Sequence, residues 1–352
     1  MSNIAERNQV TGAPGGPPGT GSGTGAVARR SANAFLQFLI QQREITVFVI
    51  AIALGVYFRA AAPDFLTRDN LVNVSQIMSP WAIIGIGEVL LLVCGEMDLS
   101  VGFILGFSPF LMHYLIDFWA VPALLAILIC LLMGMAAGAA NGFITVYLGV
   151  PSFITTLGTG FILQGIMLTT SHAYPANIPA SALGIGHWFG SYAWAEITWA
   201  IVLVAIFHLV LTRMRWGLHT IAVGGNIIGA SEAGISVAKI KMGNFMITGT
   251  LGALVGLQEA FRTNSIDPSN GSYTPMFYAI AAAVIGGTAM AGGSGTIIGA
   301  FLGALVLAEL FDGFNLIGIS ANPLPIIFGS AILVAMVANV QLARLRRAGR
   351  TS

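Results

Sequence analysis

Charged residues are scarce in this chain. Only 8% of its 352 residues are Asp, Glu, Lys or Arg, whereas about a quarter of a typical soluble domain is charged. Hydrophobic residues make up 56%, and apolar runs of about twenty residues recur, each long enough to cross the core of a bilayer. This composition excludes a soluble globular protein and predicts an all-α integral membrane protein built as a polytopic helical bundle.

Cysteines and catalytic motifs are also few. Cys94 and Cys130 both fall inside apolar runs, so the sequence offers no disulfide framework. The five histidines are scattered without the spacing of metal ligands. The nearest match to a phosphate-binding loop, Gly224–Ser231, has Ala230 where that motif requires a lysine. We therefore expect no enzymatic activity and no cofactor bound by this chain itself.

The two ends of the chain differ from the apolar middle. A Gly/Pro/Ser/Thr tract within the first 44 residues cannot build a core, so residues 1–44 are expected to form a disordered tail. Residues 342–352 form a short basic tail, which leaves 45–341 as the transmembrane domain. A signal peptide would place its apolar region nearer the start, although cleavage after Ala60-Ala61-Ala62 is an alternative.

About ten segments are expected to span the membrane. They are 45–62, 79–95, 99–117, 120–147, 151–170, 192–212, 244–262, 276–292, 296–311 and 323–341. Residues 70–78 are too polar to span and are expected at the interface. Asn141 beside Gly142 is a candidate break in the fourth segment.

Twelve of the fifteen basic residues lie in three clusters that ten spans would place on one side of the membrane. The clusters are Arg7, Arg29, Arg30 and Arg43; Arg213, Arg215, Lys239 and Lys241; and Arg344, Arg346, Arg347 and Arg350. The positive-inside rule makes that side cytoplasmic, so both termini and the loop 213–241 are expected there. Because the basic residues form three separate clusters, they do not make one positively charged face that could bind nucleic acid.

The loop 213–241 contains a short predicted helix. Asn226 is a favourable N-cap and Gly234 a favourable stop, so Asn226–Gly234 predicts about two helical turns. A helix of this length is not stable alone in water and has to pack against something. The loop is therefore predicted to dock on a soluble partner.

Glycine is abundant, with 44 residues, and many of them recur every four positions. The ladders are Gly134/Gly138/Gly142, Gly295/Gly299/Gly303, Gly102/Gly106 and Gly252/Gly256. Small residues at this spacing let helix backbones approach closely in lipid. We expect tight packing within one subunit, with a subunit interface as the alternative.

Polar side chains inside the spans are candidates for a solute route. The acids are Glu88, Glu259 and Glu309, with Glu96 and Asp98 at a span junction, and the uncharged residues are Asn141, Gln164, Asn244 and Gln258. Hydrogen bonds between helices are the alternative role for all of them. Asp98 and Ser100 also have the pattern of a helix cap.

Five segments in the right order resemble the permease subunit of bacterial ribose/xylose-type ABC importers, over about residues 45–340. They are Gly95–Gly102 (GEMDLSVG), Pro151–Thr159 (PSFITTLGT), Ala222–Val237 (AVGGNIIGASEAGISV), Gly286–Gly295 (GGTAMAGGSG) and Gly313–Ser320 (GFNLIGIS). Two positions depart from the family pattern: Glu96 replaces a small residue, and Tyr278 stands where an acid is frequent.

The resemblance implies the transmembrane subunit of an ATP-binding cassette importer in the bacterial inner membrane, forming the path for a monosaccharide or similar small polar solute. It implies a cytoplasmic ATPase that holds ATP and Mg, an extracytoplasmic solute-binding protein, a second permease copy and surrounding lipid. The expected ATPase-coupling residues are Asn226, Gly229, Ala230, Ser231, Glu232, Gly234 and Ile235. The expected translocation-path residues are Asp98, Ser100, Asn141, Gln164 and Glu309.

Three alternatives stay open at this point. A branched-chain amino acid permease of the same superfamily would share the architecture and the docking loop. A stand-alone secondary transporter or channel would need buried charge pairs or a repeated polar filter, and a membrane enzyme would need clustered carboxylates or histidines at a membrane face. The sequence shows neither pattern.

Overall fold

A computed structural model describes residues 43–318 and, beyond them, only residues 325–326, 329–330, 333–334, 337 and 341. The expected tail 342–352 and nearly all of the tail 1–44 lie outside the described residues. Most of the expected tenth span, 323–341, does so too. The expected number of ten spans therefore stays a prediction.

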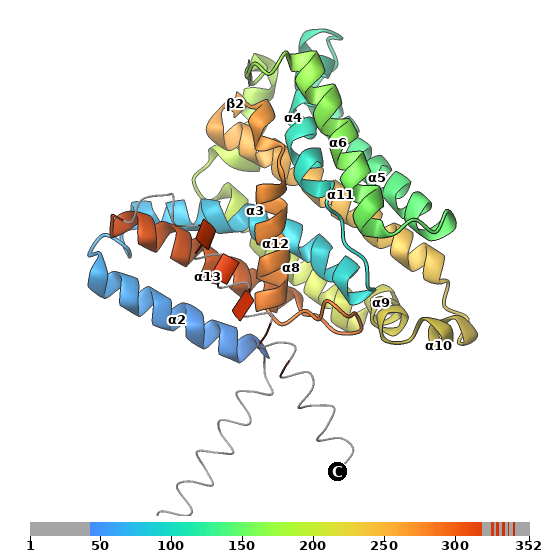
Figure 1. Ribbon diagram of the computed structural model, residues 1–352. Helices are drawn as coiled ribbons and strands as arrows, with labels where there is room; N and C mark the ends of the chain where they lie inside the picture. Colours follow the sequence, from blue (N-terminus) through green and yellow to red (C-terminus); the bar gives the residue numbers. More distant parts are fainter. Residues whose placement is uncertain are drawn as a thin grey trace, which may run out of the picture. The chain divides into compact units, whose positions relative to one another are not determined.

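Helices make up most of the described chain (Figure 1). The longer ones are α2 (Arg43–Ala61), α3 (Arg68–Val93), α4 (Val101–Asp117), α5 (Ala123–Tyr147), α6 (Ser152–Ser171), α8 (Ala195–Arg213), α11 (Val237–Thr263), α12 (Tyr273–Ile285) and α13 (Ile297–Leu316). The shorter ones are η1 (Ala180–Ala182), α7 (Leu183–Gly186), η2 (His187–Ser191), α9 (Arg215–Gly225), α10 (Ile227–Glu232) and η3 (Pro268–Asn270). Strands β1 (Ala176–Asn177) and β2 (Ser265–Ile266) pair antiparallel.

Seven of the described helices are long and apolar enough to cross a membrane: α2, α3, α5, α6, α8, α11 and α13. This confirms the predicted all-α polytopic membrane protein. Large apolar side chains are exposed along these helices, among them Ile52, Leu128 and Ile162. An exposed apolar surface of this size is expected to contact lipid rather than water.

Helix α3 differs from the sequence-based prediction because it begins at Arg68 and includes the polar residues 70–78. The amide groups of Asn70 and Asn73 each donate to the carboxylate of Asp312 in α13, over 2.6 Å in both cases. Polar side chains that find partners in a neighbouring helix can continue a helix that their hydropathy alone would end. Residues 70–78 therefore belong to the same helix as the expected span 79–95, and their placement at the membrane interface stays a prediction.

Two further boundaries differ from the prediction. Helix α5 runs through Asn141 and Gly142 without a break. Helix α12 ends at Ile285, well before the expected residue 292. The chain then turns at Gly287, Gly292 and Gly293, whose φ angles are +96°, +84° and +77°, a region that favours glycine.

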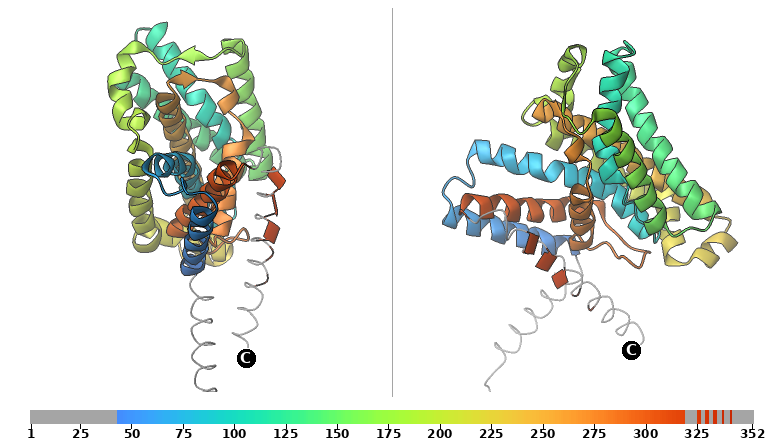
Figure 2. Two further views of the ribbon diagram at one scale, coloured as in Figure 1. Left: turned by 90° about the vertical axis from the view of Figure 1, so that its left-hand side faces the viewer. Right: turned by 45° about the horizontal axis from the view of Figure 1, so that its top comes forward.

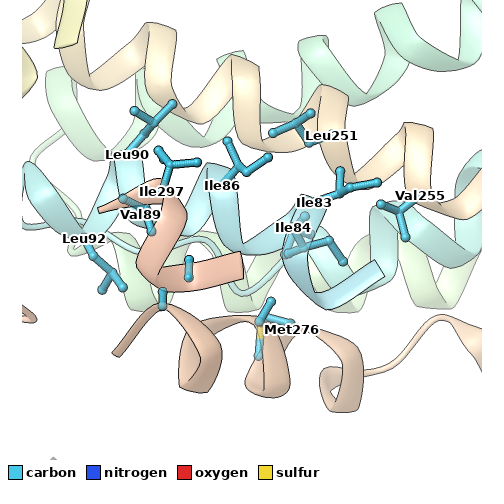
Figure 3. Close-up of a cluster of buried hydrophobic side chains, with 14 of the residues drawn as sticks. Ile83, Ile84, Ile86, Val89, Leu90, Leu92, Leu251, Val255, Met276 and Ile297 are labelled. Atoms are coloured by element: carbon cyan, nitrogen blue, oxygen red, sulfur yellow. The ribbon is translucent and has the colours of Figure 1, made fainter. Parts of the chain in front are cut away.

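Helix α3 forms the core of the bundle, with every residue from Met78 to Val93 buried. Its residues Ile83 and Leu90 pack in one cluster with Leu251 of α11 and Met276 of α12, as Figure 3 shows. Helix α3 is therefore surrounded by other helices, among them α8, α11, α12 and α13.

The glycine ladders pack helices inside the subunit, as predicted. Helix α5 lies alongside α11 (Figure 1), and a Cβ atom added at Gly138 would lie 2.1 Å from the carbonyl oxygen of Phe245. The contact is mutual, because a Cβ atom at Gly249 would lie 2.1 Å from the carbonyl oxygen of Gly134. These two helices therefore meet backbone to backbone.

The remaining helices pack in the same way. A Cβ atom at Gly303 of α13 would lie 2.1 Å from the carbonyl oxygen of Ala282 in α12. Figure 2 shows α2 beside α13, where Val47 and Ala51 pack on Val306. Helix α4 begins against the chain just before α12, where a Cβ atom at Gly102 would lie 2.1 Å from the carbonyl oxygen of Ser272.

Candidate functional site

The predicted docking helix is present as α10, a helix of six residues. The side-chain oxygen of Asn226 accepts a hydrogen bond from the Gly229 amide over 3.0 Å, as an N-cap does. Gly234 adopts a φ of +81°, and the Ile235 amide donates to the Ala230 carbonyl over 3.0 Å. Both ends of α10 are therefore fixed by local bonds, as the sequence predicted.

Helix α10 has an inner and an outer face. Ala230 is 5% exposed and packs with Cys94, Val223 and Ile240. Ile228 is 72% exposed, and its neighbour Ile227 is also exposed. Ser231 and Glu232 are exposed as well, whereas Ile235 packs at the edge of the inner cluster. The surface available to a partner is thus the outer face, with Ile227, Ile228, Ser231 and Glu232, and Ala230 belongs to the subunit's own packing.

Helix α9 packs closely against the end of α3 at a glycine, Gly224. A Cβ atom at Gly224 would lie 1.6 Å from the carbonyl oxygen of Val93, so no larger residue fits there. The same Val93 carbonyl accepts a hydrogen bond from the Gly293 amide over 2.8 Å. Two of the sequence motifs, around residues 222–226 and 286–295, therefore meet at one point. We call this contact of Val93, Gly224 and Gly293 the glycine junction.

An ion pair forms a second connection nearby. The Lys241 ammonium at the start of α11 lies 2.5 Å from a carboxylate oxygen of Glu96. Both side chains are mostly buried, with exposed fractions of 14% and 12%. Glu96 departs from the family pattern, and its partner lies in the loop 213–241, which sequence reasoning did not connect with it.

Asp98, Ser100 and Asn141 form a fully buried polar cluster. The Asp98 carboxylate accepts hydrogen bonds from the Ser100 amide and hydroxyl, over 2.8 and 2.6 Å. The Asn141 amide donates to the Ser100 hydroxyl over 2.8 Å. Burial raises the pKa of the Asp98 carboxyl above its ordinary value, although the bonds from Ser100 and Asn141 act in the opposite direction.

Two members of this cluster were not assigned to it from the sequence. Thr156 of α6 accepts a hydrogen bond from the Leu99 amide over 3.0 Å. Glu88 of α3 accepts one from the Asp98 amide over 3.5 Å. The Asp98 carboxylate thus bonds within the turn before α4, whose N-cap residue is Ser100 and shows no side-chain cap bond. The cluster holds this turn against α3, α5 and α6.

The other two expected path residues lie apart from this cluster. Gln164 is half-buried on α6, two turns beyond Thr156. Glu309 of α13 is 9% exposed and lies near α2, where a Cβ atom at Gly55 would be 3.6 Å from its carboxylate oxygen. Among the described residues, no group of three or more His, Cys, Asp or Glu is placed to hold a metal ion.

A cavity of about 200 Å³ is lined in part by residues near the C-terminal end of α11, whose N-terminal end follows α10. Beside it, the Arg262 guanidinium donates to the Glu259 carboxylate, with 2.9 Å between Nε and Oε2. The same Nε lies 3.4 Å from an oxygen of buried Glu196 in α8. The cavity is lined by Asn73, Gln76, Ile77, Pro80, Trp81, Leu105, Glu259, Arg262, Asn270, Pro275 and Phe311.

Comparison with known proteins gives the family. Residues 70–340 match the family described as branched-chain amino acid transport system / permease component. The xylose/arabinose import permease protein XylH of Sulfolobus acidocaldarius is 35% identical over 305 residues, which cover 85% of this chain and 85% of that protein. The ribose import permease protein RbsC of Escherichia coli K12 is 33% identical over 307 residues, covering 85% of this chain and 94% of that protein.

A third relative is the D-allose transport system permease protein AlsC of Escherichia coli K12, 30% identical over 300 residues, with 83% of this chain and 89% of that protein covered. No solved structure shows a significant match to the chain. The predicted resemblance to sugar import permeases is thus confirmed over most of the chain. This membrane protein belongs to the family of branched-chain amino acid transport system permease components, and the relatives named here are that family's sugar import permeases.

Proposed function

We propose that this chain is the transmembrane subunit of an ABC importer for a monosaccharide or a similar neutral polar solute. The observation that carries the proposal is α10, which presents Ile227 and Ile228 outward while its inner face packs on the subunit. A protruding apolar face fixed at both ends is suited to a separate protein partner. The relatives supply the class of solute, since their names give xylose, arabinose, ribose and allose.

In this proposal the partner is a cytoplasmic ATPase that holds ATP and Mg and docks on the outer face of α10. Movement of α10 displaces α9, because Asn226 both ends α9 and caps α10. The glycine junction passes this displacement to the end of α3. The pair of Lys241 and Glu96 passes it to the loop 94–100.

The loop 94–100 is the element that this movement would reach. Asp98 bonds to Ser100, the N-cap residue of α4, and contacts Asn141, so a shift of the loop moves the start of α4 relative to α5. Asp98, Ser100 and Asn141 are fully buried and do not line an open route within the described subunit. This burial favours a route between two permease copies, with half-buried Gln164 and buried Glu309 as its remaining candidate residues.

The distribution of basic residues supports an orientation in which α10 lies in the cytoplasm. The end of α11 near Arg262 then faces the outside, where a solute-binding protein would deliver the solute. This chain hydrolyses no ATP in this scheme, because hydrolysis belongs to the partner.

The test is uptake by the complete importer in liposomes. The chain is reconstituted with the ATPase and binding protein encoded beside it, and uptake of labelled xylose, ribose, allose and leucine is measured with and without ATP. ATP-dependent uptake of one sugar supports the proposal. Uptake of leucine alone would favour a branched-chain amino acid permease, and uptake without the ATPase would favour a secondary transporter; either result overturns the proposal.

A further inference from the structure

The cavity beside Arg262 has the composition of a site for a small hydroxyl-rich molecule. Five of its lining side chains are polar: Asn73, Gln76, Glu259, Arg262 and Asn270. They come from α3, α11 and η3, so separate elements bring their polar groups to one space. Convergent polar groups in a concave apolar site are the usual mark of a ligand pocket.

Four of the five polar side chains of the cavity, Asn73, Gln76, Glu259 and Arg262, are held in position. The Arg262 side chain is fixed between Glu259 and Glu196, which come from α11 and α8. The Asn73 amide donates to Asp312, and the Gln76 amide is 3.4 Å from the Ala193 carbonyl oxygen. Groups held by neighbours lose little conformational entropy when a ligand binds, and this favours binding.

Aromatic rings supply the apolar part of the lining. The ring of Trp81 packs on that of Tyr278, with 4.7 Å between centroids, and lies 6.3 Å from the ring of Phe311 at an angle of 82°. A sugar ring presents C–H groups on its faces and hydroxyl groups at its edges. Aromatic faces beside amides and a carboxylate match that division of polarity.

Charge and size narrow the class of ligand. The ion-pair group contains two carboxylates, Glu196 and Glu259, against one guanidinium, so its formal charge does not attract an anion. The cavity of about 200 Å³ is smaller than the roughly 300–1,000 Å³ of pockets for drug-sized ligands. The charge disfavours a sugar acid, and the volume disfavours a larger saccharide. A neutral molecule with a single sugar ring fits both the charge and the volume of the cavity.

We propose that this cavity is a binding site, within one subunit, for a neutral monosaccharide, with Gln76, Asn270 and the pair of Glu259 and Arg262 contacting its hydroxyl groups. The proposal rests on the importer function proposed above and adds a place where the permease itself contacts the solute. Its residues Glu259 and Arg262 lie near the C-terminal end of α11, and the N-terminal end of α11 follows α10. In the proposed orientation the C-terminal end of α11 faces the outside, from which the sugar is delivered.

The test is direct binding to the purified full-length chain in nanodiscs, without its partners. Xylose, ribose, allose and glucuronate are titrated, and affinity is read by calorimetry and by the fluorescence of Trp81 and the other tryptophans. We expect Gln76→Leu and Asn270→Ala each to weaken binding of the preferred neutral sugar at least fivefold, which is the effect of one lost hydrogen bond. Asn177→Ala, an exposed β1 variant outside the cavity, serves as the control and should bind like the wild type.

The outcomes separate this site from the importer function. Absence of neutral sugar binding to the wild type, tighter binding of glucuronate, or unchanged affinity in both variants overturns the site. Asn270 is exposed on η3, so its variant keeps the test valid if Gln76→Leu fails to fold. If the complete importer takes up sugar equally well with and without these substitutions, the importer function stands and the site fails. If the wild-type importer takes up no sugar, the importer function itself fails.

Discussion

Lys241 places its ammonium 2.5 Å from the carboxylate of Glu96 and so joins the second turn of α11 to the loop that precedes α4. Lys241 follows α10 by nine residues, whereas Glu96 precedes Asp98 by two. The pair therefore links the helix that follows α10 to the loop that carries Asp98 by a single side-chain contact. A contact of this kind is well suited to passing on movement, because both of its members lie in segments that carry a function in the proposal.

Neutralising either member of the pair should uncouple the importer. We expect Glu96→Gln and Lys241→Met each to lower the free energy of unfolding by about 1–3 kcal/mol, between the values for surface and buried pairs, and to lower sugar uptake per ATP hydrolysed. The exchange Glu96→Lys with Lys241→Glu should restore part of the uptake. Uptake per ATP equal to the wild type in both single variants would exclude a coupling role for the pair.

The glycine junction gives a matched pair of variants on one helix. A Cβ atom at Gly224 would lie 1.6 Å from the Val93 carbonyl oxygen, whereas one at Gly225 would meet nothing within 4 Å. Gly224→Ala should therefore lower the free energy of unfolding by about 1–3 kcal/mol and reduce ATP-driven uptake. Gly225→Ala should leave both near their wild-type values, as thermal unfolding and liposome uptake would show. Equal effects of the two substitutions would contradict this account.

The outer face of α10 predicts the site of ATPase docking. Ile228 is 72% exposed, so Ile228→Asp should change the free energy of unfolding by no more than about 0.5 kcal/mol. The same substitution should abolish co-purification of the ATPase, because it places a charge in an apolar contact. Ala230→Leu provides the contrast, since Ala230 is buried and its enlargement should destabilise the subunit itself. An Ile228→Asp chain that still binds the ATPase would show that docking occurs elsewhere.

Substitutions at Thr156 and Thr159 of α6 test how the turn before α4 is held in place. Thr156→Val removes the acceptor of the buried Leu99 amide and should cost about 1–3 kcal/mol of stability, because that amide would be left unpaired. The Thr159 hydroxyl bonds only to Thr155 of its own helix, so Thr159→Val should cost much less. Unfolding of the two purified chains in detergent measures the difference. A smaller loss for Thr156→Val than for Thr159→Val would remove Thr156 from the cluster.

The parts of the structure that depend on local sequence were predictable. Apolar runs located the helices, and the cap at Asn226 with the turn at Gly234 located α10 to within two residues. The four-residue glycine spacing correctly indicated close helix packing. These features follow from the chain's neighbours along the sequence, which is what a pattern of residues reports.

The parts that depend on contacts between distant residues were not predictable. The polar start of α3 is helical because Asn70 meets Asp312, which lies 242 positions away. The role of Glu96 depends on Lys241, and Glu88 joins Asp98 only because the loop 94–100 folds back on α3. The cavity beside Arg262 could not be found in advance either, since six separate elements line it.

The glycine junction also limits how this subunit can be recombined with its relatives. Its three segments meet chiefly through backbone atoms, so few side chains are present that could adapt to a new neighbour. A chimaera that takes α9 from a relative should therefore function only if the loop 286–296 and the end of α3 come from the same parent. Segments far apart in the gene would then have to be exchanged together, as one inherited module.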